Sequence, residues 1–127
     1  MNPLPQWQRF TETGGANLLD EILSDEVSFH SPVVWTPQKG KFLTKMYLMA
    51  AAHIFKEGGF VYSKKIINGN MACLEFETKI GNVTVNGADI ITWDGEGKIT
   101  EFKVMVRPIK AVNAVWEKMA EMLEKLK

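Results

Sequence analysis

The sequence predicts an α+β fold, in which short helices come first, a curved antiparallel sheet follows and an amphipathic helix ends the chain. Two observations carry this prediction. Apolar residues recur at intervals of three and four over residues 41–55 and 110–127, which is the spacing of helices that pack through one face. Between these segments, residues 60–106 divide into short β-rich runs separated by Asn and Gly, as in consecutive antiparallel strands.

The N-terminal segment is expected to form two short helices. Residues 6–13 form the first, which ends at Gly14 because glycine readily adopts the left-handed conformation that closes a helix. Residues 17–23 form the second, with Asn17 as the N-cap, since its side chain can accept a hydrogen bond from a free amide of the first turn. The apolar sides of the two helices carry Trp7, Phe10, Leu18, Leu19 and Ile22.

A brief strand, a loop and a central helix are expected next. Residues 27–30 are extended, and Pro32 ends them because proline lacks an amide donor; a loop follows through Pro37. Residues 41–55 form the central helix, and His53 continues its apolar series, which favours a hydrogen-bonded histidine in the core. The other members of that series are Phe42, Met46, Met49 and Ala50.

Four strands are expected in the second half of the chain, at residues 60–67, 71–80, 83–93 and 98–106. In the second of these, apolar and charged residues alternate, so one face is buried and the other is wet. The outward side chains Glu75, Glu77 and Lys79 are expected to be solvated and to form salt bridges across the strands. In the last helix, residues 110–127, the Met and Trp side chains are expected to belong to the core.

The composition bounds the partners and the setting. The 127 residues fit one domain, residues 1–127, and fifteen basic residues balance fifteen acidic ones, so no nucleic-acid partner is expected. No apolar stretch approaches the ~20 residues of a membrane span, and the N-terminus lacks a signal-peptide pattern. The single cysteine, Cys73, excludes an internal disulfide and favours the cytoplasm. Two histidines without ligand spacing predict no metal, and no cofactor is expected.

One carboxylate, Asp89, lies within an apolar strand, where an ionisable residue is unusual unless it is paired, exposed or functional. A curved sheet leaves space between its concave face and the helices, and this space suits a small hydrophobic guest. From the residues alone, Asp89 either faces that pocket or lies at a strand end, solvated or bonded to backbone amides. The apolar residues expected to line the pocket are Trp7, Phe10, Leu48, Leu74, Phe76, Phe102, Val104 and Val106.

Two segments carry a resemblance to a known family. One comprises residues 29–33 (Phe-His-Ser-Pro-Val) with residues 39–40 (Lys-Gly), and the other contains Asp89 and residues 94–99 (Asp-Gly-Glu-Gly-Lys-Ile). With the order of elements, they resemble the ketosteroid isomerases of the nuclear transport factor 2-like superfamily, a cone-shaped group that also includes SnoaL-like polyketide cyclases. The resemblance implies a curved sheet wrapped around the N-terminal helices and a homodimer formed through the sheet.

The resemblance also implies roles for single residues. The isomerases place their acidic base before the proline of the first segment, and here that position is Ser31, whose hydroxyl is too weak a base near neutral pH. Asp89 stands where the isomerases place the carboxylic acid that donates a hydrogen bond to the developing oxyanion. The tyrosine that completes their oxyanion hole comes from the first helix, where this chain has Trp7, Arg9 and Phe10 instead.

His30 is an alternative base, but neighbouring strand residues point in opposite directions, so only one of His30 and Ser31 is expected to face the pocket. The resemblance favours Ser31, which leaves His30 as a structural or interfacial residue. Three functions remain open. The chain is a binder of a small hydrophobic or carbonyl-containing molecule, an isomerase-, cyclase-, dehydratase- or hydrolase-type enzyme that uses Asp89 as the oxyanion-stabilising acid, or a dimeric interaction module without catalysis.

Overall fold

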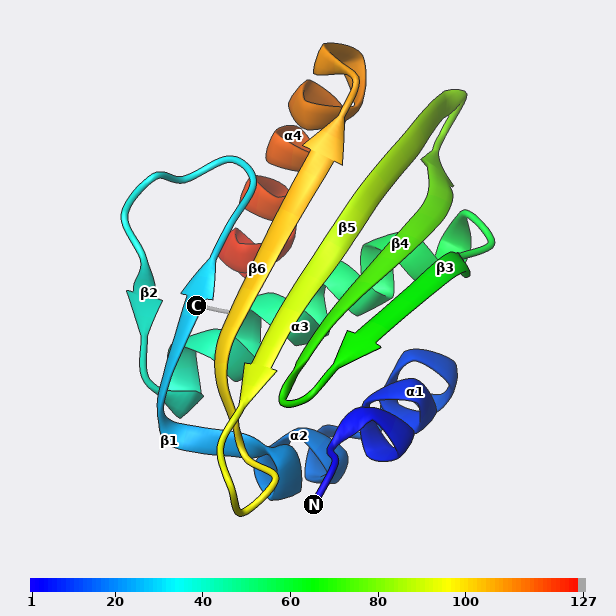
Figure 1. Cartoon of the computed structure of the whole chain (residues 1–127). Coiled ribbons are helices and arrows are strands. Elements are labelled where there is room, and N and C mark those ends of the chain that lie inside the picture. The colour runs from blue at the N-terminus through cyan, green and yellow to red at the C-terminus, as the bar shows by residue number, and fades with distance from the viewer. Residues whose placement is uncertain (126–127) are drawn as a thin grey trace.

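The computed structural model describes residues 1–125, which form four helices and six strands (Figure 1). In chain order, these elements are α1 (Leu4–Thr13), α2 (Ala16–Ile22), β1 (Leu23–His30), β2 (Gln38–Lys39), α3 (Lys41–Glu57), β3 (Val61–Asn68), β4 (Met71–Ile80), β5 (Val83–Trp93), β6 (Ile99–Arg107) and α4 (Ile109–Lys125). The helix predicted at residues 110–127 begins one residue early, and its predicted last two positions lie outside the described residues.

The strands form one curved sheet in the order β2-β1-β6-β5-β4-β3 (Figure 1). From β3 to β6, each strand pairs antiparallel with the next, as the Asn and Gly turns predict. β6 then lies beside β1 and runs parallel to it, so the sheet is mixed and not wholly antiparallel. Parallel neighbours require a long connection, and here the segment from β2 to β5 supplies it.

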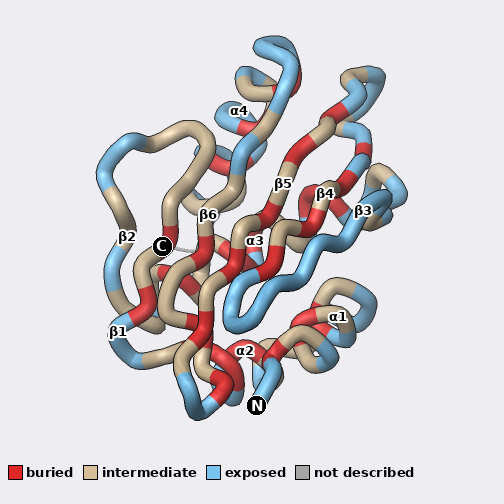
Figure 2. The backbone as a smooth tube through the Cα atoms, in the orientation of Figure 1, coloured by how far each residue is buried: buried red, intermediate tan, exposed pale blue. Residues whose placement is uncertain are grey.

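The helices cover one face of the sheet. In Figure 1, α3 and α4 lie behind it, where α3 contacts β1 and β4 and α4 contacts β5 and β6. β3, at one edge, is exposed along its length except at the partly buried Tyr62 (Figure 2). The core therefore forms between the sheet and the helices. Within residues 1–125, none of these helices combines the length and apolar character needed to cross a bilayer.

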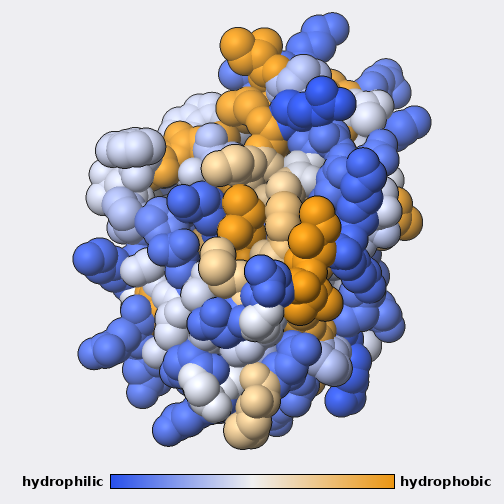
Figure 3. Space-filling model, in the orientation of Figure 1, coloured by the Kyte–Doolittle hydropathy of each residue, from blue (hydrophilic) through white to orange (hydrophobic). Residues whose placement is uncertain are grey.

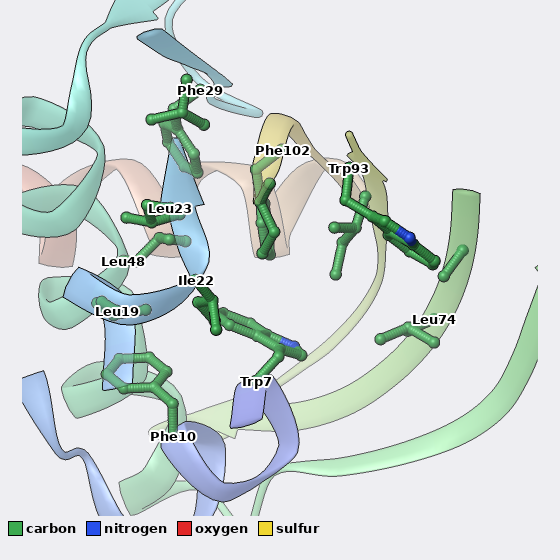
Figure 4. Close-up of a cluster of buried hydrophobic side chains, with 14 residues drawn as sticks. Trp7, Phe10, Leu19, Ile22, Leu23, Phe29, Leu48, Leu74, Trp93 and Phe102 are labelled. Carbon is green, nitrogen blue, oxygen red and sulfur yellow. The ribbon is translucent and has the colours of Figure 1, made fainter. Parts of the chain in front are cut away.

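The core consists of two clusters of buried apolar side chains. The first, shown in Figure 4, comprises Trp7, Phe10, Leu19, Ile22, Leu23, Val27, Phe29, Leu48, Ala72, Leu74, Ile91, Trp93, Ile99 and Phe102. The second comprises Ala50, Ile54, Phe55, Phe76, Val85, Ala111, Val115 and Met119. Tyr47, Tyr62 and Val104 pack against both clusters. These three side chains thus lie where the two clusters meet.

The four strands predicted in the second half of the chain and the end of the first helix are confirmed, with β3 and β6 shifted by one residue. β4 and β5 begin and end at the predicted residues. In β4, Leu74 and Phe76 are buried whereas Glu77 and Lys79 are exposed, which confirms the predicted wet face. α1 ends at Gly14, whose φ of 71° is left-handed and whose amide donates to the carbonyl four residues earlier.

Two predictions near the N-terminus are wrong. Asn17 is not the N-cap of α2, because the chain enters this helix from a glycine turn and Gly15 occupies the N-cap position without a side-chain bond. β1 begins at Leu23 and not at residue 27, since Leu23 already pairs with Ile99 of β6. Directly after the predicted loop, β2 (Gln38–Lys39) pairs with β1, and no element is predicted for these two residues from the sequence.

Some helix residues of the predicted apolar series lie at the surface, among them His53 and Trp116. The His53 side chain is 63% exposed, and its Nε2 lies 3.6 Å from Oε1 of Glu57, one turn further along α3. Trp116 of α4 is 51% exposed. Both helices carry apolar residues outside their buried face, so periodicity alone does not select the side that meets the sheet. The buried face of α3 contains Leu48, whereas Phe42 lies outside that face and is exposed.

Gly87 of β5 is a position where the packing leaves no room for a side chain. A Cβ there would lie 2.3 Å from Cζ of Phe76 and 2.6 Å from the carbonyl oxygen of Met105. We therefore expect Gly87→Ala to lower the free energy of unfolding by roughly 1–3 kcal/mol, measured by urea denaturation. Gly95→Ala is the matched control, because a Cβ on Gly95 meets nothing within 4 Å. An equal loss in both variants would contradict the packing argument.

Candidate functional site

Asp89 lies in the middle of β5, with Leu74 of β4 and Val104 of β6 as its partners in the sheet register. Side chains alternate along a strand, and the buried positions of β5 recur at every second residue from Val85 to Trp93. Asp89 belongs to this series and is only 5% exposed. The fold therefore places the carboxylate on the side of the sheet that the helices cover.

Tyr62 points into the interior because β3 contains a bulge. Tyr62 pairs with Phe76, whereas Lys64 pairs with Glu75, so Ser63 is an extra residue in this strand. Residues directly opposite each other in a sheet share a face, and Glu75 is on the outer face of β4. Lys64 is therefore directed outward, and without the bulge Tyr62 would be as well.

Three side chains join α1, β3 and β5 through hydrogen bonds. Nε1 of Trp7 donates to Oη of Tyr62 over 2.8 Å, and Oη of Tyr62 donates to Oδ2 of Asp89 over 2.6 Å. An indole N–H can only donate, so the hydroxyl proton of Tyr62 is free for Asp89 and the direction of the chain is fixed. Within residues 1–125, this bond from Tyr62 is the one that the carboxyl of Asp89 receives.

The surroundings change the acidity of both titratable groups. Burial raises the pKa of Asp89 to about 7, while the hydrogen bond from Tyr62 favours the carboxylate and acts in the opposite direction. Burial, followed by the negative charge of Asp89, raises the pKa of Tyr62 well above its ordinary value. Near neutral pH, Asp89 therefore changes its charge whereas Tyr62 keeps its proton.

A narrow apolar pocket opens beside Asp89 and receives side chains from both core clusters. The space between its atoms, the open mouth included, is about 690 Å³. Thr11 and Lys56 also border two neighbouring surface hollows, which places the mouth between α1 and α3. The apolar residues that line the pocket include Trp7, Phe10, Phe29, Leu48, Phe55, Phe60, Phe102, Val104, Val115 and Met119.

The structure brings together most, but not all, of the apolar residues expected at the pocket. Those that line it are Trp7, Phe10, Leu48, Phe102 and Val104. Leu74 is buried in the first core cluster and is not a lining residue. Phe76 packs its ring 5.4 Å from Phe55 and 5.1 Å from Phe60, measured between centroids, and those two rings face the pocket in its place. Val106 packs against the second cluster.

Ser31 and His30 have different surroundings, as the alternation of side chains requires. Ser31 lines the pocket, and its Oγ accepts a hydrogen bond from the amide of Val33 over 3.1 Å. His30 does not line the pocket, and its Nε2 lies 3.6 Å from Oε2 of Glu101 on β6. The pocket thus holds a hydroxyl where the family resemblance implies a base.

Sequence reasoning does not find Tyr62. The resemblance implies a tyrosine on the first helix, which has none. In the structure, the phenol beside Asp89 belongs to Tyr62 of β3. The alternation of Phe60 and Tyr62 is the one local signal that places both rings on the inner side. That alternation breaks at Ser63, and nothing in the sequence marks the bulge.

Metal ligation has no support in the described part of the chain. Within residues 1–125, no group of three or more His, Cys, Asp or Glu side chains is placed to hold a metal ion. The polar groups of the site include the carboxyl of Asp89, the phenol of Tyr62 and the hydroxyl of Ser31, beside apolar walls.

Solved structures with the same fold are numerous. A steroid delta-isomerase from Pseudomonas aeruginosa superposes with a TM-score of 0.93 at 28% identity, covering 98% of this chain and 90% of its own. An NTF2-like protein of unknown function from Cytophaga hutchinsonii gives 0.65 at 18% identity, covering 85% and 89%. A putative SnoaL-like polyketide cyclase from Jannaschia sp. gives 0.69 at 10% identity, covering 89% and 90%. No protein-family model and no curated protein matches the sequence.

The raised pKa of Asp89 makes stability depend on pH. The carboxyl titrates at about 7 in the folded protein against an ordinary value of 3.8, so the native state holds this proton more tightly than the unfolded chain does. The stabilisation is fully present below about pH 4 and is lost as the pH rises through about 7. Between about pH 4 and pH 8, the protein should lose about 4 kcal/mol of unfolding free energy relative to Asp89→Asn.

Urea denaturation of both proteins across this pH range measures the difference. Titrations of all other groups are shared by the two proteins and cancel in the comparison. A difference that stays constant with pH would contradict a buried carboxyl that ionises near neutrality.

Proposed function

We propose that this chain, which has the fold of the nuclear transport factor 2-like superfamily, binds a small, mostly apolar molecule through one oxygen atom that meets Asp89. One observation carries the proposal. The carboxyl of Asp89 is buried beside an apolar pocket, and among residues 1–125 its Oδ2 accepts a hydrogen bond from Tyr62 whereas its Oδ1 accepts none. Among the described residues, the fully enclosed side-chain oxygen without a partner is Oγ1 of Thr44 and not Oδ1 of Asp89, so Oδ1 remains accessible from the pocket and can form a hydrogen bond with a guest.

The pocket supports a guest of limited size and polarity. Its walls are mainly aromatic and aliphatic, so apolar surface of the guest gains free energy by leaving water. Below about pH 7, the protonated carboxyl of Asp89 can donate a hydrogen bond to a carbonyl oxygen; above it, the carboxylate can only accept one. The narrow interior favours a single ring or a slim chain.

Binding of cyclohex-2-enone, a small carbonyl probe, tests the proposal. We expect its affinity to be about tenfold higher at pH 5 than at pH 9, because the donating proton of Asp89 is present below about pH 7 and lost above it. Ligand-observed NMR measures the dissociation constants. Asp89→Asn should abolish the pH dependence, whereas the exposed control Asp25→Asn should retain it. A dissociation constant that is the same for all three proteins at both pH values would contradict the proposal.

An isomerase-type enzyme is the second candidate. The similarity to a steroid delta-isomerase over nearly the whole chain supports it, as does a carboxyl that exchanges its proton near neutral pH. Ser31 at the position of the family base weighs against it, since serine cannot take up a proton there without an activating base. Incubation with a β,γ-unsaturated ketone distinguishes the two candidates. If the ketone is recovered unchanged, the result supports a binder. If it is converted to the conjugated ketone, and this conversion is lost in Asp89→Asn, the result supports an enzyme.

We also propose that the chain forms a homodimer through the outer face of the sheet. Figure 3 shows apolar side chains gathered on this face among polar ones. The lining of a shallow hollow there includes Ile66 and Met105, which are 64% and 53% exposed, together with the charged Lys64, Glu75 and Arg107. Exposed apolar surface of this kind often marks an interface between proteins. The dimer is compatible with the binder, the enzyme and the interaction module.

The double variant Ile66→Glu/Met105→Glu should shift the protein from dimer to monomer, because two carboxylates from each copy would be buried at the interface. Sedimentation velocity over a range of concentrations measures the shift. The control Met49→Glu alters a partly exposed methionine on α3, away from the sheet, and should leave the dimer unchanged. A monomeric native protein, or equal dissociation of the control, would contradict this interface.

A further inference from the structure

We propose that Tyr62, held by Trp7, is a positioning residue for Asp89: its hydroxyl occupies Oδ2 and so reserves Oδ1 as the oxygen that exchanges a proton or hydrogen bond with an uncharged ketone or phenol in the pocket. The inference rests on the proposed function and deepens it, because it names the atom that meets the guest and the side chains that select it. Tyr62 is not a residue of the pocket wall and acts through Asp89.

The direction of the two hydrogen bonds determines which oxygen of Asp89 takes up the proton. The indole N–H of Trp7 donates to Oη of Tyr62 over 2.8 Å, and this bond uses a lone pair of the phenol oxygen. The hydroxyl proton then has Oδ2 of Asp89, 2.6 Å away, as its acceptor. When Asp89 takes up a proton, Oδ2 is already engaged as an acceptor, so the proton is directed to Oδ1.

The packing of Trp7 and Tyr62 holds the phenol in one orientation relative to Asp89. The indole of Trp7 packs against Phe10 and Phe102, with ring centroids 5.3 Å and 4.8 Å apart. The ring of Tyr62 meets Phe60 edge-to-face at 4.9 Å. Trp7 is almost fully buried, and the bulge at Ser63 fixes the side of β3 from which Tyr62 projects. The phenol therefore approaches the carboxyl from a direction set by the fold.

The other groups around Asp89 do not compete for this role. β4 and β6 place the uncharged Leu74 and Val104 beside it, and α1 and α4 contribute uncharged side chains to the pocket. Among the described residues that line the pocket, Lys56 of α3 carries the other charge, and it lies at the exposed mouth. Tyr62 is thus the titratable side chain that contacts the carboxyl directly.

The arrangement has a consequence for the acid. The Tyr62 hydroxyl stabilises the ionised carboxyl and so lowers the pKa of Asp89, in opposition to the larger effect of burial, which raises it. The N–H of Trp7 in turn favours ionisation of the phenol, which makes the hydroxyl a stronger donor. Removing either donor should therefore move the titration of Asp89 upward.

The test is a pH titration of the side-chain carboxyl carbons by NMR in protein labelled with ¹³C-aspartate, with Asp89→Asn used to assign the resonance. We expect a midpoint near pH 7 in the native protein and a rise of about one pH unit in Tyr62→Phe. Trp7→Phe should raise the midpoint by less. The controls are the second tyrosine and a second buried tryptophan: Tyr47→Phe and Trp93→Phe should leave the midpoint unchanged.

The outcomes separate this inference from the function on which it rests. The titration needs no guest, so an upward shift confined to Tyr62→Phe and Trp7→Phe supports the positioning role even where cyclohex-2-enone fails to bind. An unchanged or lower midpoint in Tyr62→Phe, or equal shifts in the controls, overturns it even where the probe binds. If Tyr62→Phe does not fold, Trp7→Phe alone decides by the same criterion. Where the probe binds, its affinity profile in Tyr62→Phe should move upward by the same amount as the NMR midpoint.

Discussion

The burial of the Asp89 carboxyl in an apolar interior is the constraint on which the arrangement of the rest of the site depends. An ionised carboxylate without partners is strongly disfavoured there, and the single bond from Tyr62 offsets only part of the penalty, which leaves the pKa near 7. Satisfying even one oxygen requires an edge strand with a bulge, a phenol turned inward by that bulge and an indole that leaves the phenol proton free. Side chains from α1 and β5 therefore both form a hydrogen bond with one atom, Oη of Tyr62 on β3.

The position of Asp89 follows from the sequence because strands have a period of two. The alternation in the sequence of β4 predicts that Leu74 faces the helices, and Asp89 lies directly opposite Leu74 in the sheet and so shares that face. The hairpin turns fix the register of these two strands in the same local way. The curved sheet with helices on one side, and the family resemblance, are confirmed for the same reason: both depend on patterns that short segments contain.

The features that the sequence does not predict depend on contacts between segments that are far apart in the chain. Tyr62 is inward only because Ser63 adds a residue to β3 without adding one to β4, a mismatch between two strands that neither strand reveals alone. His53 and Trp116 belong to helices whose apolar residues extend beyond one face, so the buried side is chosen by the sheet they meet. The parallel pairing of β1 with β6 likewise joins segments that most of the chain separates.

The stability that Asp89 forfeits is itself an argument about its role. An asparagine or a leucine at this position would avoid a buried charge above neutral pH, and replacing buried ionisable groups by neutral ones often stabilises a protein. Proteins keep such local conflicts chiefly at functional sites, where a perturbed carboxyl does something that a neutral residue cannot. With Ser31 in place of the family base, that capacity rests on one carboxyl. A pocket with one such group can recognise an oxygen atom and exchange a proton with it, and this is sufficient for a binder and only half of what an isomerase requires.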